Sequence, residues 1–208
     1  MTGMAPSKIV CVGRNYAAHA RELGNEVPAN PMLFFKPPSA IIASGAPIVL
    51  PAVSQQVEFE GEIAVVIGTR ARSVAADRAM QHVRGFTCAN DVTCRDLQKP
   101  DGQWGRAKGF DSFCPLGPRV VEGLDWRALV VMSRVNGEER QRAPVSDMIF
   151  SIPVLVAYIS GIMTLEPGDV ILTGTPAGVG PLVDGDVVEI EIPGVGILRN
   201  PVVGASVP

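Results

Sequence analysis

The chain has 208 residues, of which 47% are hydrophobic and 19% charged, a composition that excludes a disordered chain and suits one folded domain. The formal net charge of −3, without a basic tract, excludes the electrostatic signature of a nucleic-acid-binding protein. The longest apolar stretch, residues 148–165, is interrupted by Pro153 and Gly161 and is short for a membrane span, so we expect no membrane partner.

The cysteines and the N-terminal residues indicate the cellular compartment of the protein. The four cysteines form no Cys-x-x-Cys pair and have no histidine at zinc-finger spacing. Cys11 and Cys88 lie in apolar, strand-like stretches, where buried free thiols are usual. Residues 1–8 lack the apolar stretch of a signal peptide. We therefore expect a cytoplasmic protein with reduced cysteines.

The first predicted elements are a strand over residues 8–12 and a helix of about three turns, capped by Asn15 and ended by Gly24. On that helix His19 and Glu22 are three residues apart, so their side chains are neighbours on one face. The helix has few large apolar side chains and would dock weakly, as expected for a mobile lid. A solvated helix with an incidental pair is the alternative. His19 is nevertheless the best candidate for proton transfer near neutral pH, because the chain has only two histidines.

The strand predicted over residues 57–68 carries acidic residues at alternate positions. Side chains alternate between the two faces of a strand, so Glu58, Glu60 and Glu62 share one face. Two carboxylates about 4 Å apart repel by about 4 kcal/mol at an effective dielectric of about 20. A hard divalent cation would turn this repulsion into binding, because Mg²⁺ takes carboxylate oxygens as ligands. The alternative is a half-exposed strand with an acidic, hydrated face.

The segment that follows supplies a third acid. Ser73 is predicted to cap a helix that runs to about Val83, with His82 in a structural role near its C-terminal end. A strand over residues 86–90 comes next, and Asp91 lies at its end. Asp91 is either a helix N-cap or a third oxygen ligand beside the two strand carboxylates.

The C-terminal half is predicted to contain hairpins and one covering helix. Residues 129–135 and 138–142 flank Asn136-Gly137, the favoured two-residue hairpin turn. A helix capped by Ser151 is predicted over residues 152–162, with an apolar stripe that covers a sheet face.

The glycine-rich residues 173–180 lack the Gly-Lys-Ser/Thr ending of a phosphate-binding loop. Their backbone N–H groups could hold a small carboxylate, or the segment could be a plain wide turn. Across the whole chain strands dominate and do not alternate regularly with helices. The predicted fold class is therefore mostly β with a few helices, in a mixed β-roll or barrel-like structure, and we expect one domain over residues 1–208.

Taken together, these segments resemble one family, the fumarylacetoacetate hydrolase superfamily, and in particular its short acylpyruvate hydrolases and oxaloacetate decarboxylases. The most characteristic stretches are Glu60-Gly61-Glu62 with its apolar tail and residues 172–180. Five further stretches match in order: residues 11–16 with His19 and Glu22, Phe34-Phe35-Lys36-Pro37, residues 90–98, Lys108, and residues 148–153.

The resemblance implies a mixed β-roll, a homodimer and a small 2-oxo acid as substrate. It implies that one Mg²⁺ or Mn²⁺ ion is bound by Glu60, Glu62 and Asp91. It implies catalytic roles for the His19 and Glu22 dyad, on a helix that orders over the site, for Lys108, which polarises the substrate, and for Gln98, which places the substrate or the water. It implies substrate contacts for Arg14, Gly174 and Thr175.

The implied reaction is hydrolysis or decarboxylation of a carbon–carbon bond in a small 2-oxo acid, such as an acylpyruvate or oxaloacetate, through a metal-chelated enolate. One alternative is isomerisation of 2-hydroxyhepta-2,4-diene-1,7-dioate or 5-carboxymethyl-2-hydroxymuconate, which needs the same chelate and a proton shuttle. A second alternative is a 2-oxo acid binding protein without catalysis, which would not require His19, Glu22 and Lys108 together. The sequence does not choose among these reactions.

Overall fold

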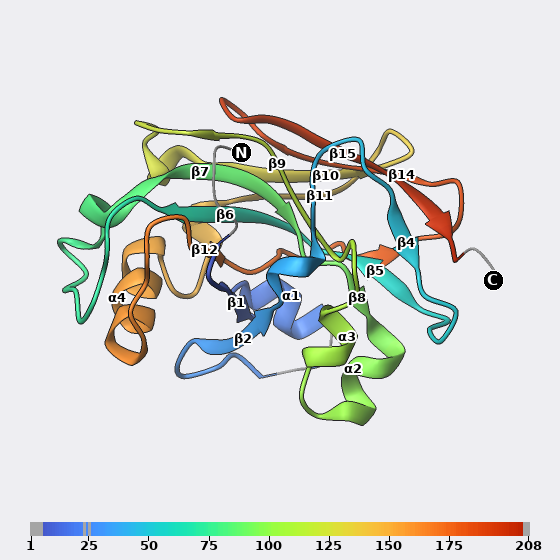
Figure 1. Cartoon of the computed structure of the whole chain (residues 1–208), viewed down its shortest axis with the longest axis horizontal. Helices are drawn as coiled ribbons and strands as arrows, with labels where there is room; N and C mark the ends of the chain where they lie inside the picture. The colour runs from blue at the N-terminus through green and yellow to red at the C-terminus, as the bar shows by residue number, and fades with distance from the viewer. Residues whose placement is uncertain (1–5, 23, 25, 206–208) are drawn as a thin grey trace.

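The structure of the chain is a computed structural model that describes residues 6–22, 24 and 26–205 (Figure 1). The described strands form three sheets. The largest has the order β2 (Met32–Lys36), β1 (Ile9–Gly13), β12 (Val170–Leu172), β6 (Gly61–Ile67), β7 (Val83–Asn90), β9 (Cys114–Val121) and β3 (Ile41–Ile42). The second has the order β11 (Glu138–Pro144), β10 (Val130–Val135), β14 (Val187–Ile192), β15 (Gly196–Gly204) and β4 (Ile48–Leu50). The third contains the short strands β13 (Gly180–Pro181), β5 (Val57–Phe59) and β8 (Thr93–Cys94).

The helices of the described residues are short, and α4 is the longest of them. The α-helices are α1 (Ala17–Glu22), α2 (Arg95–Asp101), α3 (Gly105–Lys108) and α4 (Ile152–Ile162). The 3₁₀ helices are η1 (Pro38–Ala40), η2 (Ala79–His82), η3 (Trp126–Ala128) and η4 (Val145–Asp147). Within the ranges given above, none of the helices has the length and apolar character required to cross a membrane.

The largest sheet curls on itself, and its topology explains why. β2 and β3 lie at opposite edges of this sheet, yet only Pro37 and η1 separate them along the chain. Four residues span at most about 14 Å, so the two edges must approach each other. Figure 1 shows the long strands of both large sheets arching across one side of the molecule, with α1, α2 and α3 gathered on the other. The predicted fold class, mostly β with a barrel-like roll and a few helices, is confirmed.

The core lies between the two large sheets and is built on β6, whose seven residues are all buried. Ile63, Val65 and Ile67 share one apolar cluster with Ile190 of the second sheet. Ala64 points to the other face, into a smaller cluster of mainly small side chains inside the curled sheet: Ile9, Cys11, Ala40, Ala89, Cys114, Leu116, Val170 and Leu172. The strand therefore needs apolar residues on both faces.

All four cysteines are buried free thiols, as predicted for Cys11 and Cys88. Burial is the largest cause that raises the thiol pKa at each position, to about 12 for Cys88 and Cys114. The thiols therefore stay protonated and act as small apolar groups in the core.

The hairpin over β10 and β11 and the bounds of α4 agree with the predicted elements, but two predicted helices need correction. The segment from Ser73 to Val83 forms turns and the short η2. Ser73 has a left-handed φ of 50°, and most of the segment is exposed, with Val74, Ala79, Met80 and Val83 packed on the core. The helix α1 spans six residues, and Gly24, which was predicted to end it, has a φ of 67°. Leu23 of the predicted helix lies outside the described residues.

Asn15 was predicted to cap α1, and this prediction is wrong. Its amide donates to the carbonyls of Phe150 at 3.0 Å and Thr173 at 2.8 Å, and its Oδ1 accepts the N–H of Phe150 at 2.8 Å. These bonds hold the start of α1 to two distant segments. No pattern in the sequence predicted the bounds of α2, α3 or β9, whose residues have no apolar periodicity.

An ion pair between the partly exposed Lys8 and the buried Asp169 joins the start of β1 to the turn before β12 and gives a pH-dependent prediction. The Asp169 side chain is fully buried and accepts hydrogen bonds from Ser7, from the Lys8 backbone and from the Glu166 N–H, while Lys8 Nζ lies 2.5 Å from Oδ2. Burial alone would raise the pKa of Asp169, but these partners outweigh it and lower the pKa below its usual value.

We expect Asp169→Ala to lower the free energy of unfolding by about 2–3 kcal/mol at neutral pH, because buried donors lose an ionised acceptor. A lowered folded-state pKa contributes stability above the unfolded-state value of about 3.9 and loses it as the pH falls through the folded value. Urea titrations should therefore show the difference between the two proteins shrinking below about pH 4. A difference that is constant from pH 7 to pH 3 would contradict this role for Asp169.

Candidate active site

Three buried carboxylates meet at the start of β6 and the end of β7. Glu60 occupies the break between β5 and β6, Glu62 lies in β6, and Asp91 directly follows β7. The antiparallel register pairs Gly61 with Asn90, so the Asp91 N–H donates to the Glu60 carbonyl at 2.9 Å. One carboxylate oxygen from each acid lies within 4.8 Å of the others, and none of the three residues is more than 5% exposed.

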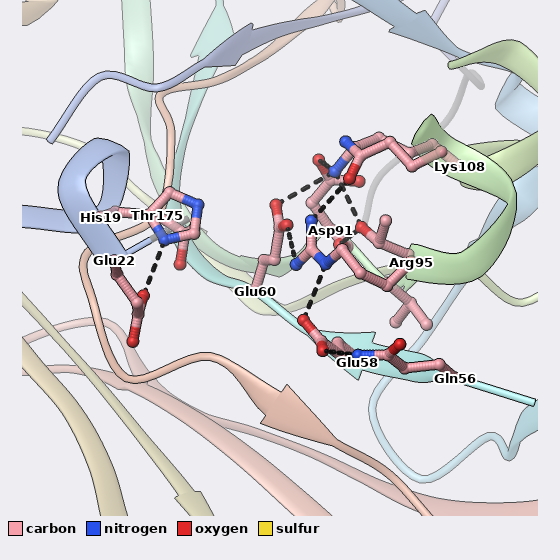
Figure 2. Close-up of polar contacts among 12 residues, drawn as sticks. His19, Glu22, Gln56, Glu58, Glu60, Asp91, Arg95, Lys108 and Thr175 are labelled. Carbon is pink, nitrogen blue, oxygen red and sulfur yellow. Dashed lines mark hydrogen bonds and ion pairs between the residues drawn. The ribbon is translucent and has the colours of Figure 1, made fainter. Parts of the chain in front are cut away.

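Lys108, at the C-terminal end of α3, lies between two of these acids (Figure 2). Its Nζ is 3.0 Å from Glu60 Oε2 and 2.7 Å from Asp91 Oδ2. Lys36, at the end of β2, binds Asp91 as well, with Nζ 2.5 Å from Oδ1. Burial disfavours the charged form of Lys108, but the charges of Asp91 and Glu60 outweigh it and raise its pKa above the usual value. Lys108 is therefore a buried cation.

Arg95, the first residue of α2, binds the acidic strand from its other side. Nη2 lies 2.7 Å from Glu60 Oε1 and Nε lies 2.8 Å from Glu58 Oε2, and both contacts are drawn in Figure 2. Nη1 donates to Gln98 Oε1 at 2.8 Å. Glu58 thus shares a face with Glu60 and Glu62, as the alternation predicted, but its partners are Arg95 and the Gln56 amide.

The three acids differ in their electrostatic surroundings. Burial alone would raise the pKa of Glu60, but Lys108 and Arg95 hold it well below the usual range. The pKa of Glu62 is well above its usual value because of burial and of the negative charges of Asp91 and Glu60. Only the Gly174 N–H, at 2.5 Å, and the more distant Lys108 oppose this shift. One negative charge of the cluster is therefore left without a close cationic partner.

These residues fit a hard divalent cation. All three side chains offer carboxylate oxygens, which are the ligands that Mg²⁺ and Mn²⁺ prefer. The crowding that raises the pKa of Glu62 is the repulsion that a cation would relieve. Asp91 caps no helix, because α2 begins at Arg95 with Cys94 at its N-cap position. The structure thus removes the alternative that was open for Asp91.

The second group of polar residues is the pair on α1. His19 Nδ1 lies 3.0 Å from Glu22 Oε2, and Glu22 Oε1 accepts the Gly178 N–H at 2.9 Å. Because a carboxylate accepts and does not donate, the proton of the neutral ring lies on Nδ1 and Nε2 keeps a free lone pair. In Figure 2 this second nitrogen of His19 faces the side on which Glu60 lies.

The predicted site residues meet around one cavity of about 510 Å³. Eight of the ten line it: Arg14, His19, Glu60, Glu62, Asp91, Gln98, Lys108 and Thr175. The other two lie directly behind lining residues, Glu22 behind His19 and Gly174 behind Glu62. Arg14 has a left-handed φ of 57° at the turn between β1 and α1. The structure therefore brings together residues from five separate parts of the chain.

Sequence reasoning missed the roles of Lys36, Arg95 and Trp104. Lys36 lies in the apolar strand β2 and is 1% exposed, so a lysine inside an apolar stretch was the available signal. No local sequence pattern distinguished Arg95 from a solvent-exposed arginine. Trp104 packs edge-on against Phe34 with 5.1 Å between ring centroids, and these rings form an apolar wall of the cavity beside Lys108 Nζ, which is 4.9 Å from the Phe34 centroid.

A curled β-roll with a buried carboxylate triad facing a histidine–glutamate pair defines the class of protein. The sequence model described as Fumarylacetoacetate (FAA) hydrolase C-terminal matches residues 8–203. The chain belongs to the fumarylacetoacetate hydrolase family, as the resemblance indicated.

Several relatives and structures are similar to this chain over most of its length. Oxaloacetate tautomerase FAHD1, mitochondrial, of Bos taurus is 45% identical over 193 residues, which cover 90% of this chain and 87% of the relative. The crystal structure of 5-carboxymethyl-2-hydroxymuconate delta-isomerase from Mycobacterium smegmatis is 50% identical with a TM-score of 0.92 and covers 98% of this chain and 81% of its own. That of 2-hydroxyhepta-2,4-diene-1,7-dioate isomerase from Mycobacterium marinum is 49% identical with a TM-score of 0.91, with coverages of 98% and 77%.

The carboxylate triad gives a direct prediction. Mg²⁺ or Mn²⁺ should raise the melting temperature of the protein, because a ligand that binds the native state stabilises it by about 2.7 kcal/mol at a hundredfold excess over Kd. In Glu62→Ala this gain should vanish.

The matched control is Glu58→Ala, which removes an acid from the same face of the chain but outside the triad. Thermal melts with and without the cation should show the gain in this control. An equal gain in Glu62→Ala would show that the cation binds elsewhere.

Proposed function

We propose that the chain is a divalent-metal-dependent enzyme that interconverts the enol and keto forms of a small 2-oxo acid with two carboxylates. One observation carries the proposal: a buried carboxylate triad and an oriented histidine share one cavity. Isomerisation requires a site for the 2-oxo acid end and one group that carries a proton, and both are present. The relatives named above as an oxaloacetate tautomerase and two isomerases support this choice over the others.

Glu60, Glu62 and Asp91 would hold the cation. When bound, a divalent cation supplies Lewis acidity toward the keto and carboxylate oxygens of a 2-oxo acid. Lys108 and Arg95 keep Glu60 ionised, and the Gly174 N–H fixes the Glu62 carboxylate. Lys108 Nζ also lies at the cavity wall, where it can donate to an oxygen that gains negative charge.

His19 is the group that moves the proton. Glu22 orients the ring through Nδ1, and Gly178 holds Glu22 in turn. Nε2 is therefore free to take a proton from the carbon next to the keto group and deliver it to the keto oxygen, which gives the enol, or to carry it from oxygen to carbon in the reverse direction. His19 itself is 4% exposed. Because the imidazole is buried and oriented, the proton that it carries exchanges little with bulk water during the transfer.

The second carboxylate of the substrate would bind elsewhere in the cavity. Arg14 and Lys99 also line the cavity, as does Gln98, which accepts a hydrogen bond from Arg95. Either cation could bind the second carboxylate of a substrate whose 2-oxo acid end lies at the triad. Phe34 and Trp104 add an apolar wall.

Substitution of the two histidines tests this proposal. His19→Ala should lower the Mg²⁺-dependent rate of oxaloacetate enol–keto interconversion by about 10²–10⁴-fold, because the positioned base is lost. His82, which contacts Thr69 outside the cavity, provides the matched control, and His82→Ala should keep the wild-type rate. The assay is the decay of enol absorbance above the rate without enzyme, repeated with acylpyruvates and hydroxymuconate-type diacids. A His19→Ala enzyme as fast as wild type would overturn the mechanism.

Cleavage of a carbon–carbon bond is the second candidate function. It is favoured by the same His19–Glu22 pair, which has the arrangement of a general base that activates water. In hydrolysis of an acylpyruvate the base is essential, whereas loss of CO₂ from oxaloacetate requires no water attack. If cleavage is the reaction, the ratio of hydrolysis to decarboxylation should fall in His19→Ala relative to wild type. An unchanged ratio would exclude His19 as a base dedicated to water.

The homodimer, the lid role of α1 and the cytoplasmic location stay predictions. Light scattering tests the first: we expect about twice the 22.0 kDa mass of one chain. A mass near 22.0 kDa at all concentrations would contradict a dimer.

A further inference from the structure

The backbone of Glu60 and Gly61, between the carboxylates of Glu60 and Glu62, is held by groups from other parts of the chain. β5 and β6 are separated by Glu60, where the regular ladder is interrupted. The backbone polar groups of Glu60 and Gly61 have four partners: Asn90 Oδ1 on the Glu60 N–H, the Asp91 N–H on the Glu60 carbonyl, Gln141 Oε1 on the Gly61 N–H and Thr175 Oγ1 on the Gly61 carbonyl. Three of these four partners are side chains, and the fourth is the backbone N–H of Asp91.

Gln141 connects this peptide to the second sheet. It lies in β11, at the edge of the second sheet, and is 1% exposed. Its Oε1 accepts the Gly61 N–H at 3.0 Å, and its Nε2 donates to Thr175 Oγ1 at 2.8 Å and to the Pro176 carbonyl at 2.7 Å. One amide therefore joins the acidic segment to the glycine-rich loop.

The contact with Gly61 leaves no spare room. A Cβ at Gly61 would lie 2.9 Å from Gln141 Oε1 and 3.0 Å from Ile190 Cδ1, so the amide packs directly on the peptide. Thr175 completes this set of hydrogen bonds, since its hydroxyl donates to the Gly61 carbonyl and accepts from Gln141 Nε2. Both polar groups of Gly61 therefore have their positions set, directly or through Thr175, by this one side chain.

We propose that Gln141 is a positioning residue of the candidate metal site, which sets the distance between the Glu60 and Glu62 carboxylates and holds Thr175 at the cavity wall. The inference rests on the proposed function, because it assumes that the triad binds a cation. A buried amide costs free energy unless its hydrogen bonds are made. Here the observed bonds go to Gly61, which lies between two acids of the triad, and to Thr175 and Pro176 of the glycine-rich loop, of which Thr175 lines the cavity.

Binding of Mn²⁺ to metal-free protein tests the inference without any assay of activity. In Gln141→Met, which keeps the length of the side chain and removes its polar atoms, Kd for Mn²⁺ should rise by about 10–100-fold, as is usual when a group that orients metal ligands is lost. The readout is the electron paramagnetic resonance signal of free Mn²⁺, titrated with protein.

Asn200→Leu is the matched control. Asn200 is also a buried amide, 1% exposed, and it donates two hydrogen bonds, to the carbonyls of Ala43 at 2.9 Å and Ala46 at 2.8 Å, away from the triad. Urea denaturation of both variants without metal measures the loss of stability in each. The control should lose stability and keep the wild-type Kd.

A Gln141→Met protein that loses stability and binds Mn²⁺ as tightly as wild type would overturn the inference and leave the proposed function intact. Wild-type protein that binds no Mn²⁺ would overturn the proposed function, and the inference with it. If Gln141→Met does not fold, Thr175→Val removes the hydroxyl link at nearly constant volume. That variant should weaken Mn²⁺ binding by about 10-fold or more, and an unchanged Kd would count against the inference.

Discussion

The structure depends on the burial of four carboxylates around one break in a strand. Glu58, Glu60, Glu62 and Asp91 are each 7% exposed or less. A buried charge without a partner costs several kcal/mol, so such a cluster requires compensating charges. Arg95, Lys36 and Lys108 supply them from α2, β2 and α3. The short helices α2 and α3, which have little apolar surface to bury, are thus held to the sheets by ion pairs.

Compensation is complete for every acid except Glu62. Its carboxylate has the Gly174 N–H as its close donor, and the pKa of Glu62 is raised by burial and by the neighbouring negative charges. Electrostatic repulsion is therefore left at the Glu62 carboxylate, where a cation with carboxylate ligands would relieve it. Such a site costs stability in the metal-free protein and gains it on binding.

The glycine-rich loop links the two halves of the candidate active site. Gly174 donates to Glu62 and Thr175 to the Gly61 carbonyl, on the side of the carboxylates. Gly178 donates to Glu22, on the side of the histidine. Gly174 has a φ of 97°, and a Cβ there would lie 2.7 Å from Asn15 Cβ, so the loop also packs on the residue that precedes Tyr16 and α1. A shift of this loop would therefore move the contacts of both Glu22 and Glu62.

Local patterns in the sequence determined the parts of this protein that depend on near neighbours along the chain. Strand alternation put Glu60 and Glu62 on one face, Asn136-Gly137 specified a hairpin, and the apolar stripe of Ile152–Ile162 specified α4. Where most of a segment is exposed, as after Ser73, local helix signals were insufficient. Only the tertiary structure decided that Lys36, Arg95 and Gln141 meet the acidic segment, because their approach depends on how the sheet curls and on the register of strands that are far apart in sequence.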